Sequence, residues 1–352
     1  MEGMRRKLKK ALLYLLIFLF IFFLLPAFLT KNSIKSNLET SAEDQGQFPK
    51  ESLEGVEQNN SEAVTENEYD YNQYAKIKLL HKKTEEIEEV NLDEYLCNVV
   101  SAEMPVDYEK EALKAQAIVA RTYTIFKIQN PKHGNSDICD DSTCCQAWIS
   151  KEDRLARWEE SKRESNWNKI QEAVKETQGK IITYNNEPIN AFFHSNSGGT
   201  TEVPVNVWGG RNYPYLQVVQ TTGEEGYNQY SSEVELTNEE LLNKLRGKYS
   251  DIQIDFNNKD DIKILEYTDS NRVKTIKFGN HEFAGVEARS ILGLKSTNFE
   301  IVKEDEKIKF SVKGYGHGVG MSQTGADAMA KEGKNCEEII KHFYVGVSID
   351  NI

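Results

Sequence analysis

The amino-acid sequence predicts an α+β protein, in which mixed, mainly antiparallel sheets pack with helices, preceded by one transmembrane helix and a disordered linker. Three observations predict it: an uncharged apolar stretch, a polar acidic stretch after it, and then apolar residues at both helix and strand spacing without a regular alternation. We therefore divide the chain into a cytoplasmic basic tail (1–10), a transmembrane anchor (11–30), an acidic linker (31–75) and a folded domain (76–352).

The N-terminal segment has the composition of a membrane anchor. Five basic residues lie at positions 5–10, and the nineteen residues 11–29 carry no charge, which is about the length that crosses a bilayer. Basic residues ahead of the apolar span favour a cytoplasmic N-terminus, so we expect the folded domain to be extracytoplasmic. A cleaved signal peptide is the alternative, but the segment lacks a small-x-small cleavage site.

The linker and the folded domain are both acidic. Residues 39–75 contain ten acidic residues and one lysine, with few large apolar side chains, so we expect a disordered tether. The whole chain has a formal net charge of −13, of which about −10 falls on residues 76–352. Such a charge argues against a nucleic-acid partner, which would need a basic surface.

The first predicted helix of the domain carries one acidic residue on its apolar side. Two short strands, 77–80 and 86–90, come before it. The helix is expected to be capped by Asp93, to bury one apolar stripe and to end ahead of Pro105. At helical spacing, Glu103 falls on the same side as that stripe.

The remaining predicted elements are short helices and hairpins. An alanine-rich helix covers 109–129, and a charged helical stretch covers 151–178 after a loop that contains cysteines. A hairpin turns at Asn185-Asn186 and leads through His194 into a polar loop. The later elements are strands at 262–267 and 272–278, a helix near 286–292, a hairpin over 299–312, and helices after Ser322 and after Asn335.

Residues 314–323, Gly-Tyr-Gly-His-Gly-Val-Gly-Met-Ser-Gln, form the most informative stretch of the chain. Alternate glycines weaken any helix or strand, so we expect a loop that brings bare backbone amides and the tips of His317, Ser322 and Gln323 against a ligand. The spacing matches neither a dinucleotide fingerprint nor a phosphate loop. The stretch therefore predicts a cradle for an uncharged or sugar-like ligand, with a structural bend as the alternative. Residues 195–199 form a second polar, glycine-containing loop.

Glu103 is the strongest candidate for a general acid. A carboxyl near an apolar face at a helix end has its charged form disfavoured, so it can hold a proton to donate. The alternative is a structural ion pair with a basic residue such as Arg121. Glycoside hydrolysis normally uses two carboxylates, and neither glycine-rich loop supplies a second one.

Serine–histidine pairs are a weaker alternative for the chemistry. His194 could act with Ser195 or Ser197, and His317 could act with Ser322. Neither pair has a nucleophile elbow or an evident orienting acid, so hydrogen bonding to a polar ligand is the simpler interpretation.

Three of the five cysteines cluster in one loop. His133, Cys139 and Cys145, with Cys144 adjacent, offer soft ligands that suit a structural, tetrahedral zinc ion. A disulfide from Cys139 to Cys144 or Cys145 is the alternative, because an extracytoplasmic compartment permits it. The other two thiols, Cys97 and Cys336, are expected to be buried within helices.

Four sequence blocks, taken in order, resemble the stage II sporulation protein D family of membrane-anchored lytic transglycosylases. The blocks are residues 95–105, 111–123, 194–199 and 314–323, and they span nearly all of the folded domain. The resemblance implies that Glu103 is the catalytic acid. It also implies that the following residues surround the glycan: Arg121, His194, Ser195, Ser197, Gly198, Gly199, His317, Gly318, Gly320, Met321, Ser322 and Gln323.

The resemblance further implies the reaction and its setting. The acid protonates the oxygen between N-acetylmuramic acid and N-acetylglucosamine, then accepts a proton from the muramic acid 6-hydroxyl, which closes a 1,6-anhydro ring. Peptide-stripped peptidoglycan would be the substrate, stage II sporulation proteins P and M the partners, and the mother-cell membrane facing the forespore the location. The cysteine cluster resembles a zinc-bearing clostridial variety. A non-catalytic, wall-binding amidase activator and a zinc hydrolase are the other functions considered.

Overall fold

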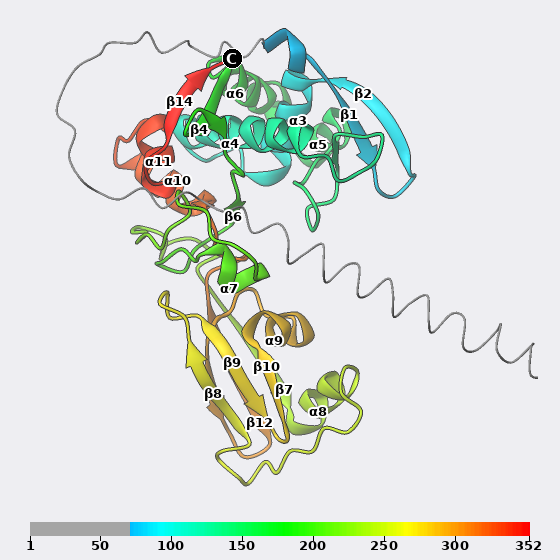
Figure 1. The fold of residues 1–352 in the computed structure, drawn as a ribbon, viewed down its shortest axis with the longest axis vertical. Helices are drawn as coiled ribbons and strands as arrows, with labels where there is room; N and C mark the ends of the chain where they lie inside the picture. Colours follow the sequence, from blue (N-terminus) through cyan, green and yellow to red (C-terminus); the bar gives the residue numbers. More distant parts are fainter. Residues whose placement is uncertain (1–70) are drawn as a thin grey trace, which may run out of the picture. The chain divides into compact units, whose positions relative to one another are not determined.

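The computed structural model describes residues 71–352 (Figure 1). Within this range, helices and short, mainly antiparallel sheets follow one another irregularly, which confirms the predicted α+β class. The predicted tail and anchor, and nearly all of the predicted linker, lie outside the described residues. Among the described residues, no helix combines the length and the hydropathy that a bilayer crossing requires.

Apolar residues gather in two separate hydrophobic cores. The elements around the first core are η2 (Tyr71–Tyr74), β1 (Lys76–His81), β2 (Glu86–Asn91), α3 (Leu92–Glu103), α4 (Lys110–Gln129), β3 (Ile138–Cys139), α5 (Lys151–Arg157), η3 (Glu160–Lys162), α6 (Arg163–Lys175), β4 (Lys180–Tyr184), β5 (Glu187–Pro188), β6 (Phe193–His194), α7 (Pro204–Trp208), β13 (Met321–Ser322), α10 (Gln323–Lys331), α11 (Cys336–Phe343) and β14 (Ser348–Asn351).

Helix α4 is the centre of the first core. Its alanines, among them Ala112, Ala117 and Ala120, are fully buried, and small side chains let α3, α6, α10 and α11 approach closely. Three small sheets surround these helices, with strand orders β2-β1-β3, β14-β4-β5 and β13-β6. The β1–β3 and β13–β6 pairs are parallel, and the others are antiparallel.

The second core is an insertion between β6 and β13. Its elements are β7 (Ser231–Thr237), α8 (Asn238–Arg246), β8 (Ile262–Tyr267), β9 (Val273–Phe278), β10 (His281–Ala284), α9 (Gly285–Leu292), β11 (Asn298–Lys303) and β12 (Lys307–Lys313). They form two antiparallel three-stranded sheets, β10-β9-β8 and β11-β12-β7, on which α8 and α9 pack. The insertion separates the two glycine-containing loops in sequence, and the β6–β13 pair brings them together again.

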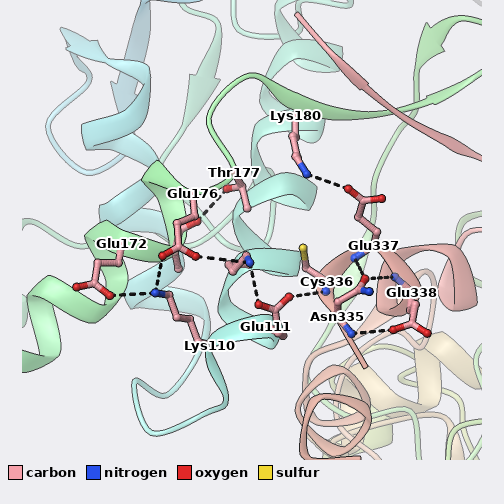
Figure 2. Close-up of polar contacts among 12 residues, drawn as sticks. Lys110, Glu111, Glu172, Glu176, Thr177, Lys180, Asn335, Cys336, Glu337 and Glu338 are labelled. Carbon is pink, nitrogen blue, oxygen red and sulfur yellow. Dashed lines mark hydrogen bonds and ion pairs between the residues drawn. The ribbon is translucent and has the colours of Figure 1, made fainter. Parts of the chain in front are cut away.

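Polar contacts along α4 fix the orientation of its neighbours (Figure 2). Glu111 accepts a hydrogen bond of 2.8 Å from the backbone N–H of Cys336, the first residue of α11. Lys110 pairs with Glu172 and Glu176 at the C-terminal end of α6. These ion pairs are partly exposed to solvent, so they contribute little to the free energy of folding. Burial of apolar side chains supplies most of the stabilisation, and the polar contacts fix how the helices align with one another.

Most predicted elements are confirmed, and three details are wrong. Asn91, not Asp93, caps α3, because its side chain accepts hydrogen bonds from the amides at the start of the helix. The charged stretch 151–178 is not one helix, since Trp158 adopts an extended conformation between α5 and α6 and packs on the first core. The hairpin turn at Asn185-Asn186 forms, but its second strand is short.

That second strand leaves the sheet at Asn190, whose N–H bonds to the Tyr215 hydroxyl at 3.0 Å instead of to β4. β6 therefore pairs with β13 and not with β4. The structure also contains β7, α8, β10 and β14, which are additional to the predicted elements.

Candidate functional site

Glu103 ends α3 and is held between two other segments. Its Oε1 accepts a hydrogen bond of 2.6 Å from the backbone N–H of Ala147. Its Oε2 accepts one of 3.3 Å from Nε2 of Gln323, the first residue of α10. The same Gln323 nitrogen lies 3.5 Å from Oε1 of Gln116 on α4. The carboxyl therefore has a fixed position at the meeting point of three helices and a loop.

The surroundings of Glu103 favour its protonated form. Burial raises the pKa of Glu103 above its ordinary value, and it outweighs the hydrogen bonds from Ala147 and Gln323, which lower the pKa. A carboxyl with a raised pKa retains a proton closer to neutral pH. Glu103 therefore has the property that a general acid requires.

A cavity opens beside the turn that follows Glu103. It has a volume of about 630 Å³, and Pro105, Tyr108, Tyr227 and Lys331 are among the residues that line it. Another cavity, of about 450 Å³, lies along the N-terminal part of α3 and includes Asp93 in its lining. The first cavity lies beside the end of α3 that carries Glu103, and the second lies beside the opposite end of this helix.

The glycine-rich run 314–323 turns its glycines toward the protein and not toward a ligand. A Cβ atom at Gly320 would lie 1.8 Å from the backbone oxygen of Phe192, and one at Gly318 would lie 2.7 Å from the guanidinium of Arg272. Both glycines have positive φ values, 73° and 84°. The amide of Met321 donates to the Phe192 oxygen at 3.1 Å. The expectation that these glycines expose bare amides to a ligand is therefore wrong for Gly318 and Gly320.

A buried carboxylate, Glu224, joins the two glycine-containing loops, and no feature of the sequence distinguishes it from Glu225 beside it. Its side chain is fully buried and accepts six hydrogen bonds. The donors are the backbone N–H and hydroxyl of Ser197, the N–H of Gly199, and the hydroxyls of Thr221, Ser322 and Thr324. Both loops are thus fixed to one anion.

These contacts keep Glu224 ionised. Burial disfavours the charge, but hydrogen bonds from Ser197, Ser322 and Thr221 outweigh it and hold the pKa of Glu224 below its ordinary value. With its oxygens occupied and no surface exposed, Glu224 cannot act as a base or nucleophile toward a bound glycan. Its role is to hold the loops.

The predicted metal ligands lie together. One ligand atom from each of His133, Cys139, Cys144 and Cys145 falls within 4.8 Å of all the others, so this group could hold a metal ion. Nε2 of His133 lies 3.2 Å from Sγ of Cys145 and 3.7 Å from Sγ of Cys144. All five cysteines are free, and the alternative disulfide is not formed.

The cysteine loop leads directly to the candidate acid. Gln146 is buried, and its Nε2 donates to the Tyr95 hydroxyl at 2.8 Å and to the Thr124 hydroxyl at 3.0 Å. Ala147, the next residue, supplies the amide that binds Glu103. Cys145 of the cluster that could hold a metal is therefore two residues ahead of Ala147, whose amide positions Glu103.

Comparisons with a family model and with known proteins agree on one family for this chain. The family model described as Stage II sporulation protein matches residues 80–184, which include Glu103 and the cysteine cluster. Stage II sporulation protein D of Bacillus subtilis (strain 168) is 36% identical over 279 residues, 78% of this chain and 78% of that protein. The protein of the same name from Bacillus amyloliquefaciens is 36% identical over 269 residues, 75% of each chain. The chain belongs to the stage II sporulation protein D family.

The Amidase enhancer of Bacillus subtilis (strain 168) is a more distant relative of this stage II sporulation protein D family member. It is 30% identical over 302 residues, which make up 72% of this chain and 40% of that protein.

In this member of the stage II sporulation protein D family, Arg121 lies inside the first core. Its side chain is fully buried and donates to the backbone oxygens of Val174, Thr177 and Lys180. Within residues 71–352 its ion-pair partner is Asp93, at 3.5 Å, so the alternative pair with Glu103 is not formed. A direct contact between Arg121 and a glycan, as the resemblance implied, does not agree with this placement. Its role is to tie α4 to the end of α6.

The serine–histidine alternatives are not supported by the geometry. The hydroxyls of Ser197 and Ser322 both donate to Glu224 and not to a histidine. His194 donates from Nδ1 to the Val319 oxygen at 3.1 Å. Burial, followed by the charge of Arg272, lowers the pKa of His194 to about 4, so this ring is neutral near pH 7.

The other predicted contact residues fall into two groups. Those that are at least partly exposed are Ser195, Gly198, Gly199 and His317. Those that are buried and stabilise the loops from the protein side are His194, Ser197, Gly318, Gly320, Met321 and Ser322. Gln323 is also nearly covered, yet its amide contacts the candidate acid directly.

Proposed function

We propose that this protein is a lytic transglycosylase that cleaves peptidoglycan glycan strands between N-acetylmuramic acid and N-acetylglucosamine. The observation that carries the proposal is the position of Glu103, a partly enclosed carboxyl with a raised pKa beside Gln323 and near the two glycine-containing loops. Peptide-stripped strands are the substrate that the family resemblance implies, and sporulation is the setting that the names of the relatives support.

A single carboxyl is sufficient for this reaction. Protonated Glu103 donates its proton to the glycosidic oxygen, and the bond from that oxygen to the muramic acid C1 breaks. The resulting carboxylate accepts the proton of the muramic acid 6-hydroxyl, whose oxygen bonds to C1 and closes the 1,6-anhydro ring. No water is consumed and Glu103 is regenerated. Glu224 does not supply the second carboxylate of a hydrolase, because its oxygens are occupied by loop contacts.

Incubating the full-length protein, in detergent, with denuded glycan strands tests this proposal. We expect 1,6-anhydro-muramic ends, which mass spectrometry distinguishes from the reducing ends of hydrolysis by the mass of one water. Reducing ends, or intact strands, would contradict it.

A non-catalytic amidase activator is the second candidate, favoured by the similarity to the protein named Amidase enhancer. Such a protein would bind glycan and stimulate an amidase without forming anhydro ends. Replacing Glu103 by glutamine distinguishes the two, since an activator keeps its stimulation whereas a transglycosylase loses turnover.

We also propose that the metal is zinc and that its role is structural. Three thiolates and one imidazole suit tetrahedral zinc, whose bonds of about 2.3 and 2.0 Å place ligand atoms roughly 3.5–3.8 Å apart. The distances at His133 are compatible with this spacing after small adjustments. Four protein ligands leave no open position for a substrate, which argues against a zinc hydrolase.

Replacing Cys139 by serine is expected to remove the bound zinc and to lower the melting temperature by roughly 5 °C or more, because metal binding stabilises the folded state. Loss of the metal should also loosen Ala147 and reduce the turnover that depends on Glu103. Metal analysis and calorimetry measure these effects. The matched control is Cys97→Ser, which changes a buried thiol outside the cluster and should keep the metal. A metal content unchanged by Cys139→Ser would contradict the assignment.

For location, we propose that the apolar segment 11–29 anchors the protein in the mother-cell membrane, with the folded domain facing the forespore. Stage II sporulation proteins P and M are the proposed partners, by the family resemblance.

A further inference from the structure

One tryptophan stands out on the surface near the site. Trp208 is 52% exposed, the highest value among the large apolar residues that are exposed within residues 71–352. Tryptophan is usually much more buried, and exposed aromatic surface near a site often marks a ligand contact.

The Trp208 ring is held in place before any ligand arrives. It ends the short helix α7, which begins at Pro204 and stops at Gly209. Its ring centroid lies 4.7 Å from that of Phe192 and 4.9 Å from that of His317. These two rings pack against one part of the indole, and much of the remainder faces solvent. A ring fixed in this way loses little conformational entropy when it binds.

A buried carboxylate fixes α7 itself. Oε1 of Glu202 accepts hydrogen bonds from the Val203 amide at 2.7 Å and from the Asn206 side chain at 2.8 Å. Oε2 of Glu202 accepts from Thr268 and Ser270, which belong to the inserted segment. Glu202 and its hydrogen-bond partners therefore hold α7 in place, and with it Trp208.

The run 314–323 relates Trp208 to the candidate acid. His317 in this run is partly exposed and packs on Trp208, with ring centroids 4.9 Å apart. Gln323, six residues later in the same run, contacts Glu103. Six residues span at most roughly 20 Å of extended chain, so Trp208 lies within reach of a strand bound at Glu103.

A polymer of sugars is the ligand that fits this arrangement. Each pyranose ring has an apolar face of C–H groups, which packs on an aromatic face, and polar edges that remain solvated. A strand of sugars that extends from Glu103 past the partly exposed His317 would reach Trp208 and could occupy both places at once.

We propose that Trp208 forms a second sugar-binding subsite, at which the indole stacks on a pyranose ring of the glycan strand whose scissile bond lies at Glu103. This inference rests on the proposed function, because it takes glycan as the substrate class. Trp208 binds and positions the strand and takes no part in proton transfer.

Titration calorimetry with the full-length Glu103→Gln variant tests the subsite without turnover. The probe is a denuded oligosaccharide of alternating N-acetylglucosamine and N-acetylmuramic acid, several sugars long. Adding Trp208→Ala should weaken its affinity about tenfold, and Trp208→Phe should retain most of it. In the active enzyme, Trp208→Ala should raise KM by a similar factor and leave kcat nearly unchanged.

Tyr267→Ala is the matched control, because Tyr267 is 51% exposed on β8 in the second core and should be neutral. Unchanged affinity in Trp208→Ala, or an equal loss in Tyr267→Ala, would overturn the subsite while leaving anhydro-product formation intact. Loss of affinity in a protein that forms no anhydro ends would uphold the subsite and overturn only the proposed reaction. Absence of any binding by the Glu103→Gln variant would overturn both.

Discussion

Replacing Glu103 by glutamine is expected to lower the rate of glycan cleavage by about 10²–10⁴-fold, the usual contribution of a general acid. Glutamine keeps the shape of the side chain and can still accept the Ala147 hydrogen bond. It cannot donate a proton to the glycosidic oxygen, so glycan affinity should survive while turnover is lost. Anhydro-product formation and calorimetric binding, measured on the same preparation, check the two halves of this expectation.

The same substitution should not destabilise the protein. Because burial raises the pKa of Glu103, the folded state binds its proton more tightly than the unfolded state. The wild-type protein therefore loses stability as pH rises from the unfolded value near 4.5 through the raised folded value. Glu103→Gln removes that loss, so its stability relative to wild type should increase with pH. Unfolding curves at several pH values measure the difference.

If Glu103→Gln is inactive and at least as stable as wild type, its loss of activity comes from the missing acid and not from unfolding. Glu94→Gln, an exposed acid on the same helix, is the matched control and should change neither property. Cleavage by Glu103→Gln at the wild-type rate would reject the assignment of the acid. Stimulation of an amidase by both proteins, with no anhydro ends from either, would favour the activator function.

Residues with local signals could be predicted from the sequence. Glu103 follows from helical spacing and a helix that ends ahead of Pro105, and α3 has that spacing in the structure. The helix caps at Ser322 and Asn335 are likewise local, because a capping side chain binds amides two or three residues later. The cysteine cluster is within one short loop, so its ligands can be recognised without the fold.

Features that depend on contacts between distant segments could not be predicted. Glu224 has the same local surroundings as the exposed Glu225, and only the folded chain brings Ser197 and Ser322 to it. The direction of the glycines in 314–323 also depends on distant partners, such as the backbone of Phe192 just ahead of β6. Arg121 matches the family pattern in sequence, but its burial against α6 is a tertiary property.

Replacing Glu224 by alanine is expected to cost about 3–5 kcal/mol in the free energy of unfolding, because it leaves a set of buried donors without an acceptor. The melting temperature should fall by on the order of 10 °C. Glycan cleavage should be lost even below that temperature, since Ser197 and Ser322 belong to the two loops near Glu103. Calorimetry and the anhydro-product assay measure both effects. Glu225→Ala, which removes an exposed neighbouring acid, should be neutral in both assays.

The pH dependence of this loss tests its physical cause. Hydrogen bonds hold the pKa of Glu224 below its ordinary value of 4.5, so its charge stabilises the folded state above that pH. This stabilisation disappears as pH falls through the lowered folded value, because the folded protein must then accept a proton that its hydrogen bonds oppose. The stability difference between wild type and Glu224→Gln, which cannot ionise, should therefore shrink in acid. A difference that stays constant with pH would mean that side-chain shape, and not the anion, holds the two loops together.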